Sequence, residues 1–554
     1  MTIDGTGDDA DEADADGEGS AAETDSEGGD GPLGRVAGGV RRRVRMVFKG
    51  REEFELTEGD IAKPLFYLSI PIVITNLLQT TYNLVDTIWL GRYSTEALAA
   101  ISFAFPVVFF LISLGLGISI AGSILVAQNV GAGDERRAEF AASQTVTFAV
   151  ALSVVLGAFG YFAVEDILRL LGASSDVLTG ATAYLEIVSL GMVFMFAFFV
   201  FMSLMRGYGD TITPMLVMFV TVVVNMAIDP FLIFGWGPFP ELGVVGAAYA
   251  TVFSRALATV IGMTIMFRGN RGVEITLGDM VPDLDYFRKI LRVGVPASIE
   301  GTGNAIAVNL MLVIVGTFPT AVVAAYGVGV RMFSVIFLPA IAVGRGVETM
   351  AGQNIGAKKQ DRAASASHFA ARAMFVVLAG VGVLTWLGAG NIVALFSDDP
   401  EVVEVGRLFL RYVAPTFGFT GIFHSYKGGF RGAGKTMTAA LVSITMLGFV
   451  RLPVAAVASQ DLVYEGSPLA GLASLLPGGL ANALGRAIAT PATFSMGYEG
   501  IWIAFAVSNV AGAAIAFGWY MRGTWRDVDL TDNRVAGPGP DGDADPDIDP
   551  AIDD

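Results

Sequence analysis

Gln128-Asn129-Val130-Gly131-Ala132 returns as Gln353-Asn354-Ile355-Gly356-Ala357, a spacing of 225 residues. The same spacing relates the segment RGYGDTIT at residues 206–213 to RGAGKTMT at residues 431–438. Isolated matches would not share one spacing over such a distance. The register therefore predicts two copies of one fold unit within the chain.

The composition predicts a membrane protein. Of the 554 residues, 53% are hydrophobic and 16% are charged, whereas a soluble protein carries about 25% charged residues. Charge-free stretches such as 187–205 and 373–396 are long enough to cross a ~30 Å hydrocarbon layer as helices. The acidic N-terminus lacks the pattern of a cleavable signal peptide, and the absence of Cys excludes disulfides and thiolate metal sites. We expect an all-α polytopic protein.

Both copies contain an even number of apolar stretches, so both should enter the membrane from the same side. We predict two six-helix lobes, at residues 59–270 and 271–522, related by an axis along the membrane normal, a common build of secondary transporters. The twelve predicted spans lie near residues 64–90, 95–125, 138–163, 178–205, 212–235, 243–267, 286–315, 320–349, 364–388, 402–427, 436–458 and 498–521.

The net charge of −18 resides in the two tails. Residues 1–32 hold twelve acidic residues and no Lys or Arg, and residues 526–554 hold ten acidic residues and two Arg. We expect disordered tails within 1–58 and 523–554, with a basic juxtamembrane segment at 41–51. Lys and Arg also recur at alternate connections between spans. The positive-inside rule therefore predicts that both termini are cytoplasmic and that the protein lies in the cell membrane.

One segment interrupts the repeat. Gly246 in the first half corresponds to Gly500 in the second, a spacing of 254 rather than 225 residues. This difference predicts an insertion within about 459–490. The segment is apolar but is broken by Pro and Gly, and neither part is long enough to span a membrane. We expect an outward loop with an interfacial helix.

Residues 429–436 match the phosphate-binding pattern G-x-x-x-x-G-K-[ST], which functions where it follows a strand and opens a helix. Here the pattern follows an apolar stretch of membrane length, and Asp210 occupies the position of Lys435 in the first copy. We therefore predict a tight turn in which Thr436 begins the next helix. No nucleotide or nucleic acid is expected to bind.

Two acidic residues of the first half stand at membrane depth, where each costs ~2.5–3.5 kcal/mol to insert. Asp86 lies in the first predicted span and shares a helix face with Tyr82 and Asn83, whereas Asp229 lies in the fifth span and shares a face with Asn225. Oxygen ligands suit a hard cation, or a proton shared between crowded carboxyl groups. Asp86, Asn225 and Asp229 are thus the predicted site for H⁺ or Na⁺, with no other cofactor. Alternatively, both acids are solvated near helix ends.

The repeat favours a functional role for these three residues, because the second half does not repeat them. With a spacing of 225 residues, the counterparts of Asp86, Asn225 and Asp229 are Met311, Val450 and Val454. A purely structural requirement would apply to both halves. The asymmetry therefore predicts a functional site in the first half alone.

The second half contains polar residues of its own, and the secondary candidates among them are Glu300, Arg331 and His424. We expect Glu300 and Arg331 to pair across two helices. His424 either titrates near neutrality or packs as a hydrogen-bonded residue. Glu348 is expected near the cytoplasmic end of its span, with its carboxylate reaching solvent.

These motifs resemble the multidrug and toxic compound extrusion (MATE) transporters over about residues 60–522. The resemblance rests on the two [AG]-Q-N-x-G-A segments, the two R-G-x-G-[DK]-T turns and the stretch Tyr82-Asn83-Leu84-Val85-Asp86-Thr87. The set Asp86, Asn225 and Asp229 is similar to the DinF-like branch, in which the matching residues form the cation site of the first lobe. The resemblance implies two six-helix lobes around a central cavity, and export of organic, often cationic, compounds in exchange for H⁺ or Na⁺.

The fourth span supplies candidates for an adaptable cavity wall, namely Met192, Met195, Phe198 and Met202. At helical spacing these residues could equally be packing residues, and Met202 stands where many relatives have Asn. We expect alternating access in a monomer, with small organic substrates and membrane lipids as partners. A lipid-linked oligosaccharide flippase of the same superfamily is the alternative function. A scaffold or receptor without transport is a further one, and no nucleophile–base or metal-ligand set predicts an enzyme.

Overall fold

The computed structural model describes residues 55–459 except 171, 173 and 270, together with residues 496–526 and 530–531. All of these residues belong to one compact unit, Gly50–Asp554. The predicted insertion at 459–490 lies outside the described residues except for Ser459, and so does most of both acidic tails.

The described chain folds entirely into helices joined by short turns, which confirms the predicted all-α class. The first lobe contains α2 (Ala62–Tyr93), α3 (Thr95–Gly131), α4 (Glu135–Leu170), α5 (Ser175–Leu190), α6 (Met192–Tyr208), α7 (Ile212–Phe234) and α8 (Val244–Arg268). The second lobe contains α9 (Leu284–Val315), α10 (Thr320–Ile336), α11 (Leu338–Gly356), α12 (Gln360–Ala394), α13 (Pro400–Val413), η3 (Ala414–Thr416), α14 (Phe417–Gly432), α15 (Thr436–Ile444), η4 (Thr445–Arg451), α16 (Leu452–Ser459) and α19 (Glu499–Met521).

Each of the twelve predicted spans corresponds to one helical segment of the described chain. Nine segments are long and apolar enough to cross a membrane as single helices. Two further spans are bent pairs, α5 with α6 at 54° and α10 with α11 at 40°. The last, the predicted span 402–427, is assembled from α13, η3 and α14.

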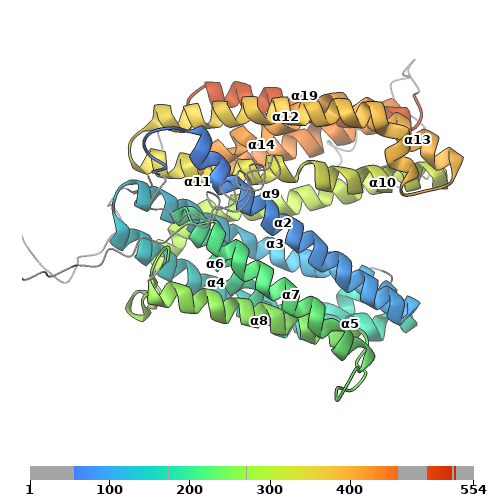
Figure 1. Cartoon of the computed structure of the whole chain (residues 1–554), viewed down its shortest axis with the longest axis horizontal. Helices are drawn as coiled ribbons and strands as arrows, with labels where there is room; N and C mark the ends of the chain where they lie inside the picture. Colours follow the sequence, from blue (N-terminus) through green and yellow to red (C-terminus); the bar gives the residue numbers. More distant parts are fainter. Residues whose placement is uncertain are drawn as a thin grey trace, which may run out of the picture. The chain divides into compact units, whose positions relative to one another are not determined.

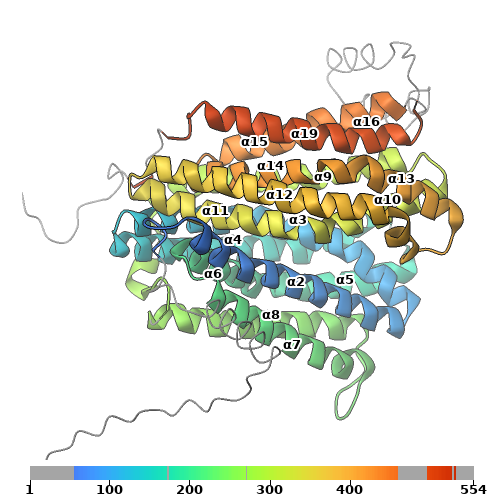
Figure 2. The ribbon, with the colours of Figure 1, turned by 45° about the horizontal axis from the view of Figure 1, so that its top comes forward.

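The two lobes pack against each other through α2, α3, α9 and α11. In Figure 1, α4–α8 lie on one side of these four helices and α10, α12, α13, α14 and α19 on the other. Figure 2 shows α15, α16 and α19 along the far face of the second lobe. Glycines allow the closest approach between α3 and α9, because a Cβ on Gly117 would lie 2.3 Å from the carbonyl oxygen of Gly294.

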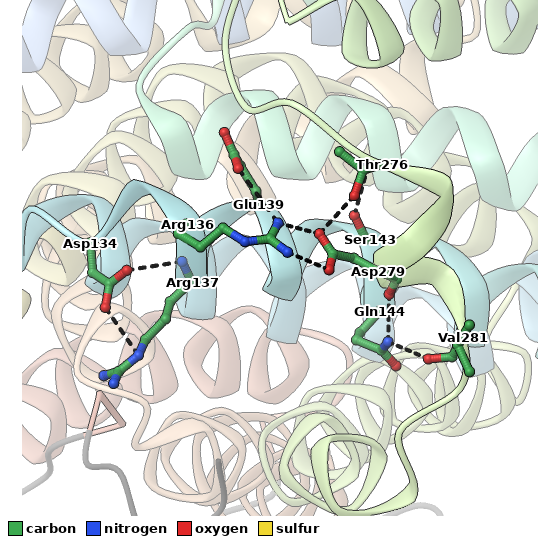
Figure 3. Close-up of polar contacts among 9 residues, drawn as sticks. All are labelled: Asp134, Arg136, Arg137, Glu139, Ser143, Gln144, Thr276, Asp279 and Val281. Atoms are coloured by element: carbon green, nitrogen blue, oxygen red, sulfur yellow. Dashed lines mark hydrogen bonds and ion pairs between the residues drawn. The ribbon is translucent and has the colours of Figure 1, made fainter. Parts of the chain in front are cut away.

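The connection between the lobes contains the short helix η2 (Leu277–Met280) and is attached to α4 (Figure 3). Arg136 forms a two-pronged ion pair with Asp279, in which Nη2 donates to Oδ1 at 2.8 Å. The Gln144 amide donates to the carbonyl oxygens of Asp279 and Val281, at 2.6 and 2.7 Å. The hydrogen bonds that Arg136 and Thr276 donate lower the pKa of the Asp279 carboxyl group. These contacts anchor the connection to the first lobe.

The repeated Gln-Asn segments explain how the lobes meet at one end of the bundle. Gln128 donates a hydrogen bond from Nε2 to the carbonyl oxygen of Gly432 in the other lobe, at 2.9 Å. Gln353 donates reciprocally to the carbonyl oxygens of Gly207 and Tyr208, at 3.1 and 3.0 Å. We call the end formed by these segments the motif end.

The glycine of each segment is required at the same contact. A Cβ on Gly131 would lie 1.9 Å from the carbonyl oxygen of Gln353, and a Cβ on Gly356 would lie 1.9 Å from that of Gln128. No side chain fits at such distances. The Gln-Asn-x-Gly pattern therefore recurs because each copy packs against the other.

The phosphate-loop pattern forms a turn between two helices, as predicted. It follows the helix α14 rather than a strand, and Gly434 adopts a φ of +74°, as its counterpart Gly209 adopts +108°. Thr436 is the first residue of α15, as predicted. The Thr436 hydroxyl does not cap its own helix but donates to the carbonyl oxygen of Val293, at 2.7 Å.

The π-helix η4 shifts the register of the repeat by one residue. Residues 229–233 are buried, buried, exposed, half-buried and buried in turn, and this pattern recurs at residues 455–459. The spacing here is thus 226 residues rather than 225. A π-helical turn takes up one more residue than an α-helical turn, so η4 accommodates the difference.

This shift corrects two of the predicted counterparts. Arg451, rather than Val450, corresponds to Asn225, and Ala455, rather than Val454, corresponds to Asp229. With either spacing, the residue that corresponds to Asp229 in the second half is not an acid.

Candidate functional site

The three residues of the predicted cation site come together inside the first lobe. Asn225 and Asp229 are fully buried in α7, and Asp86 in α2 is 5% exposed. Asn225 donates from Nδ2 to Oδ1 of Asp229 at 3.3 Å, and the carboxyl groups of Asp86 and Asp229 lie within hydrogen-bonding reach of each other. The alternative that both acids are solvated near helix ends is therefore wrong.

Three oxygen atoms of this site are buried without a hydrogen-bond partner, namely Asp86 Oδ1, Asn225 Oδ1 and Asp229 Oδ2. Two carboxylates at such close range repel each other unless a proton or a cation lies between them. Carboxylate and amide oxygens are also the ligands that a hard cation prefers. The arrangement can thus bind and release a small cation.

A cavity of about 680 Å³ adjoins Asp86 in the half of the lobe that is remote from the motif end. Its wall includes Tyr82 and Asn83, and the Tyr82 hydroxyl donates to Thr251 Oγ1 at 2.7 Å. Aromatic rings make up much of the remaining wall, from Phe105, Phe109, Tyr184 and Phe199. The volume and the apolar lining are typical of sites for drug-sized molecules.

The four cavity candidates of the fourth span occupy different positions. Met195 lines the cavity. Met192 and Phe198 are completely buried in hydrophobic clusters of the first lobe, and Met202 packs against the same cluster as Phe198. Helical spacing therefore identified the buried face of α6, but not which of its residues reach the cavity.

Sequence reasoning missed Arg255 of α8, which also lines the cavity. Its guanidinium lies over the rings of Tyr82 and Phe198, with 4.9 and 5.3 Å to their centroids, and donates from Nη2 to Gln79 Oε1 at 3.0 Å. The available signal was a single arginine in the middle of an apolar span, which is costly at membrane depth.

Glu300 in the second lobe is held by a closed set of partners. Its carboxylate accepts from Arg431 Nη2 at 2.7 Å and from Ser443 Oγ at 2.9 Å, and Lys427 Nζ lies 3.1 Å away. The predicted pair of Glu300 with Arg331 is wrong, because the Arg331 side chain is exposed on α10. Arg431, Ser443 and Lys427 thus occupy the Glu300 carboxylate, which leaves it no free position for a transported cation.

Glu348 is also buried, with 2% exposure. The prediction that its carboxylate reaches solvent is therefore wrong. It pairs with Arg345 at 3.3 Å and with Arg431 at 3.7 Å, and it is close enough to interact electrostatically with Arg206 of the first lobe. Glu300 and Glu348 thus neutralise part of a buried basic cluster near the motif end.

A second cavity, of about 270 Å³, lies in the second lobe and includes His424 and Arg451. Arg451 donates from Nε to Ser508 at 2.8 Å and from Nη2 to Asn509 at 3.1 Å, and lies 4.2 Å from the centroid of the Phe505 ring. No acidic residue is among those that line this cavity.

Comparisons with known proteins agree with this architecture. The family model MatE matches residues 71–231 and 296–457, the corresponding parts of the two lobes. The second match is one residue longer than the first, as the π-helix requires. A crystal structure described as MATE in the bent conformation superimposes with a TM-score of 0.73 at 25% identity, covering 84% of this chain and 96% of that one.

Two curated relatives match along most of their length. The probable multidrug resistance protein YoeA of Bacillus subtilis is 32% identical over 418 residues, 74% of this chain and 90% of YoeA. The FAD transporter of Shewanella oneidensis is 27% identical over 420 residues, 76% of this chain and 93% of that protein. This chain is therefore a multi-pass membrane protein of the MatE family, the multidrug and toxic compound extrusion (MATE) transporters.

Proposed function

We propose that the protein is a secondary active antiporter that exports organic compounds, cationic or amphipathic, in exchange for H⁺ or Na⁺. The buried pair Asp86 and Asp229, in contact with a drug-sized cavity, is the observation that carries the proposal. The name of YoeA as a probable multidrug resistance protein supports the same function.

The coupling follows from competition for the two carboxyl groups. Without a bound proton or Na⁺, Asp86 and Asp229 attract a cationic substrate. When H⁺ or Na⁺ binds between them, with Asn225 as a further ligand for Na⁺, the negative charge is neutralised and the substrate loses its counter-ion. Alternating access requires only that the coupling ion and the substrate bind the two states of the protein with different affinities.

We assign the conformational response to α2, which carries Asp86 and also contains the buried Pro71. Proline removes one backbone hydrogen bond from a helix and favours bending there. A change of packing around Asp86 can therefore be transmitted along α2 to the closed motif end. The positive-inside rule favours a cytoplasmic motif end, and the hydrogen bonds that join the lobes there then support an outward-facing state.

We further propose a cellular location, an oligomeric state and a set of partners for the protein. The protein acts in the cell membrane as a monomer with both termini in the cytoplasm, and its lobes are residues 59–270 and 271–522. Small organic substrates and membrane lipids are its partners, and it uses no nucleotide, nucleic acid or further cofactor. A flippase for lipid-linked oligosaccharides finds no support among the relatives reported above, which are named as multidrug or FAD transporters.

The test is export of a fluorescent organic cation from proteoliposomes that hold the purified protein, with a H⁺ gradient in one arm and a Na⁺ gradient in the other. Asp86→Asn should abolish gradient-driven export, because the amide cannot exchange a proton and carries no charge. Met311→Leu, at the corresponding position of the second lobe, serves as the matched control. Undiminished gradient-driven export by Asp86→Asn would refute the assignment.

A further inference from the structure

Arg255 presents to the wall of the first-lobe cavity a positive charge that forms no ion pair with the described residues. The residue is 4% exposed. Besides the bond to Gln79, its Nη1 makes a weak contact with Met218 Sδ at 3.7 Å, and its Nε is buried without a hydrogen-bond partner. Most of its five N–H donors are therefore not engaged by acceptors of the described chain.

The guanidinium forms no ion pair with the described residues, although Asp86 is near enough to influence it electrostatically. Arginine remains charged inside proteins, and a buried charge without an opposite charge is strongly unfavourable. Arg431 in the other lobe is balanced by Glu300 at 2.7 Å. Arg255 lacks such a partner, so an anionic group that enters the cavity would supply one.

The surroundings of Arg255 hold it in a fixed orientation. The guanidinium lies over the rings of Tyr82 and Phe198, as in a cation–π pair. Gln79, which accepts from Nη2, itself donates from Nε2 to Asn83 Oδ1 at 3.1 Å. The N–H donors that remain without an acceptor can bind the two oxygens of a carboxylate.

The geometry points to zwitterionic organic compounds as substrates of this cavity. We propose that Arg255 is the specificity-determining residue that binds the anionic group, a carboxylate, while the Asp86–Asp229 pair binds the cationic group of the same molecule. This inference rests on the proposed export function. The aromatic part of the cavity wall, which includes Phe105 and Phe199, then contacts the apolar body of the substrate.

The charge of the cavity also follows from this arrangement. The titratable groups around the guanidinium are Asp86, Tyr82 and Tyr184, and Asp229 interacts with Asp86. With both phenols neutral, Arg255 and the two carboxyl groups sum to −1 when no proton is bound, to 0 with one proton and to +1 with two. Proton binding thus expels the cationic group while retaining affinity for the anionic one, and a zwitterion leaves only when the conformation changes.

The test compares tetramethylrhodamine, a zwitterion, with its methyl ester, a cation that differs only in the carboxylate. Export of each dye is measured in proteoliposomes with wild type, Arg255→Met, Arg255→Lys and the second-lobe control Arg451→Met. The readout is the ratio of the apparent KM of the ester to that of the acid. Loss of one charge-assisted hydrogen bond should lower this ratio about tenfold or more in Arg255→Met.

Arg255→Lys keeps the charge but not the planar fork, so its ratio should fall less. Arg451→Met should keep the wild-type ratio. The inference is overturned if the wild type exports the ester but not the acid, if Arg255→Met keeps the wild-type ratio, or if Arg451→Met lowers it equally. Export of neither dye by the wild type under either gradient would instead overturn the proposed antiport function itself.

Discussion

Each lobe has one asparagine and one arginine at two corresponding positions on neighbouring helices. The two residues are exchanged between the lobes. The first lobe has Asn225 on α7 and Arg255 on α8, whereas the second has Arg451 at the end of η4 and Asn509 on α19. In the second lobe the pair is hydrogen-bonded to itself, at 3.1 Å.

In the first lobe, Asn225 and Arg255 form hydrogen bonds with other partners and not with each other. Asn225 bonds to Asp229, where the second lobe has Ala455, and Arg255 bonds to Gln79. The first lobe thus has two acids, Asp86 and Asp229, that the second lobe lacks, and atoms of both are buried without a hydrogen-bond partner. The two lobes therefore have the same helix arrangement. They differ in that the buried polar groups of the first lobe keep unpaired atoms, which can bind a proton, a cation or a substrate.

The largest expected effect comes from making the first lobe like the second. Asp229→Ala, which introduces the residue found at position 455, should reduce gradient-driven export in proteoliposomes to the leak of protein-free vesicles, because a single carboxyl group no longer shares a proton or cation. Asp166→Asn, at an exposed acid of the same lobe, is the control. Retention of coupled export by Asp229→Ala would show that the lobes do not differ in this way.

The second prediction tests whether the Glu300 site is structural. Glu300→Gln leaves Lys427 and Arg431 buried without their carboxylate, which should cost about 3–5 kcal/mol of folding stability. The measurement is the apparent Tm of the purified protein in detergent. Glu404→Gln, which removes the exposed partner of Arg407, should shift the Tm far less. Equal shifts for both variants would contradict a structural role.

The third prediction concerns the symmetry of the motif end. Gln128→Ala and Gln353→Ala each remove hydrogen bonds between the lobes, and each should cost about 1–1.5 kcal/mol. Since the chain contains no Cys, a cysteine introduced by Ala127→Cys can be labelled selectively. Ala127 is 1% exposed and faces Gly352 of the other lobe, and both variants should accelerate the labelling of this cysteine by a thiol reagent. A strong effect from one glutamine and none from the other would break the proposed equivalence.

The smallest effect is expected at the connection between the lobes. The bond to Arg136 lowers the pKa of Asp279, so the ionised carboxylate stabilises the fold above the ordinary titration range of aspartate. This contribution is lost as the pH falls from that range through the lowered pKa of the folded state. Asp279→Asn should therefore lower stability by at most ~1 kcal/mol at pH 7. The Tm difference from wild type should shrink under acid conditions, and a difference that grew on acidification would reverse the sign of the argument.

The sequence alone predicted the twelve helical segments, because apolar length and the repeat are local signals. It also singled out Asp86 and Asp229, since acids are rare at membrane depth, and the structure brings both together with Asn225. It could not pair Glu300 correctly, because Lys427 and Arg431 lie more than 120 residues further along the chain and only packing brings them together. The one-residue shift at η4 was invisible, since π-helical turns have no simple sequence pattern.

Arg255 was missed for a different reason. The second lobe has Asn509 at the corresponding position, so the repeat gave no second arginine to compare with it. A search for every charged residue within an apolar span would have identified Arg255. Its relation to the cavity follows only from the crossing of α2, α6 and α8.

The reciprocal bonds at the motif end have a consequence for the symmetry of the contact between the lobes. Gln128 contacts Gly432 as Gln353 contacts Gly207, so each patch meets its own counterpart, as in an isologous dimer with two-fold symmetry. A single half has both the donor and the acceptor of this contact, but it cannot bring them together within itself. The contact thus has the two-fold symmetry that two identical half-length subunits would form with each other, although one continuous chain supplies both halves.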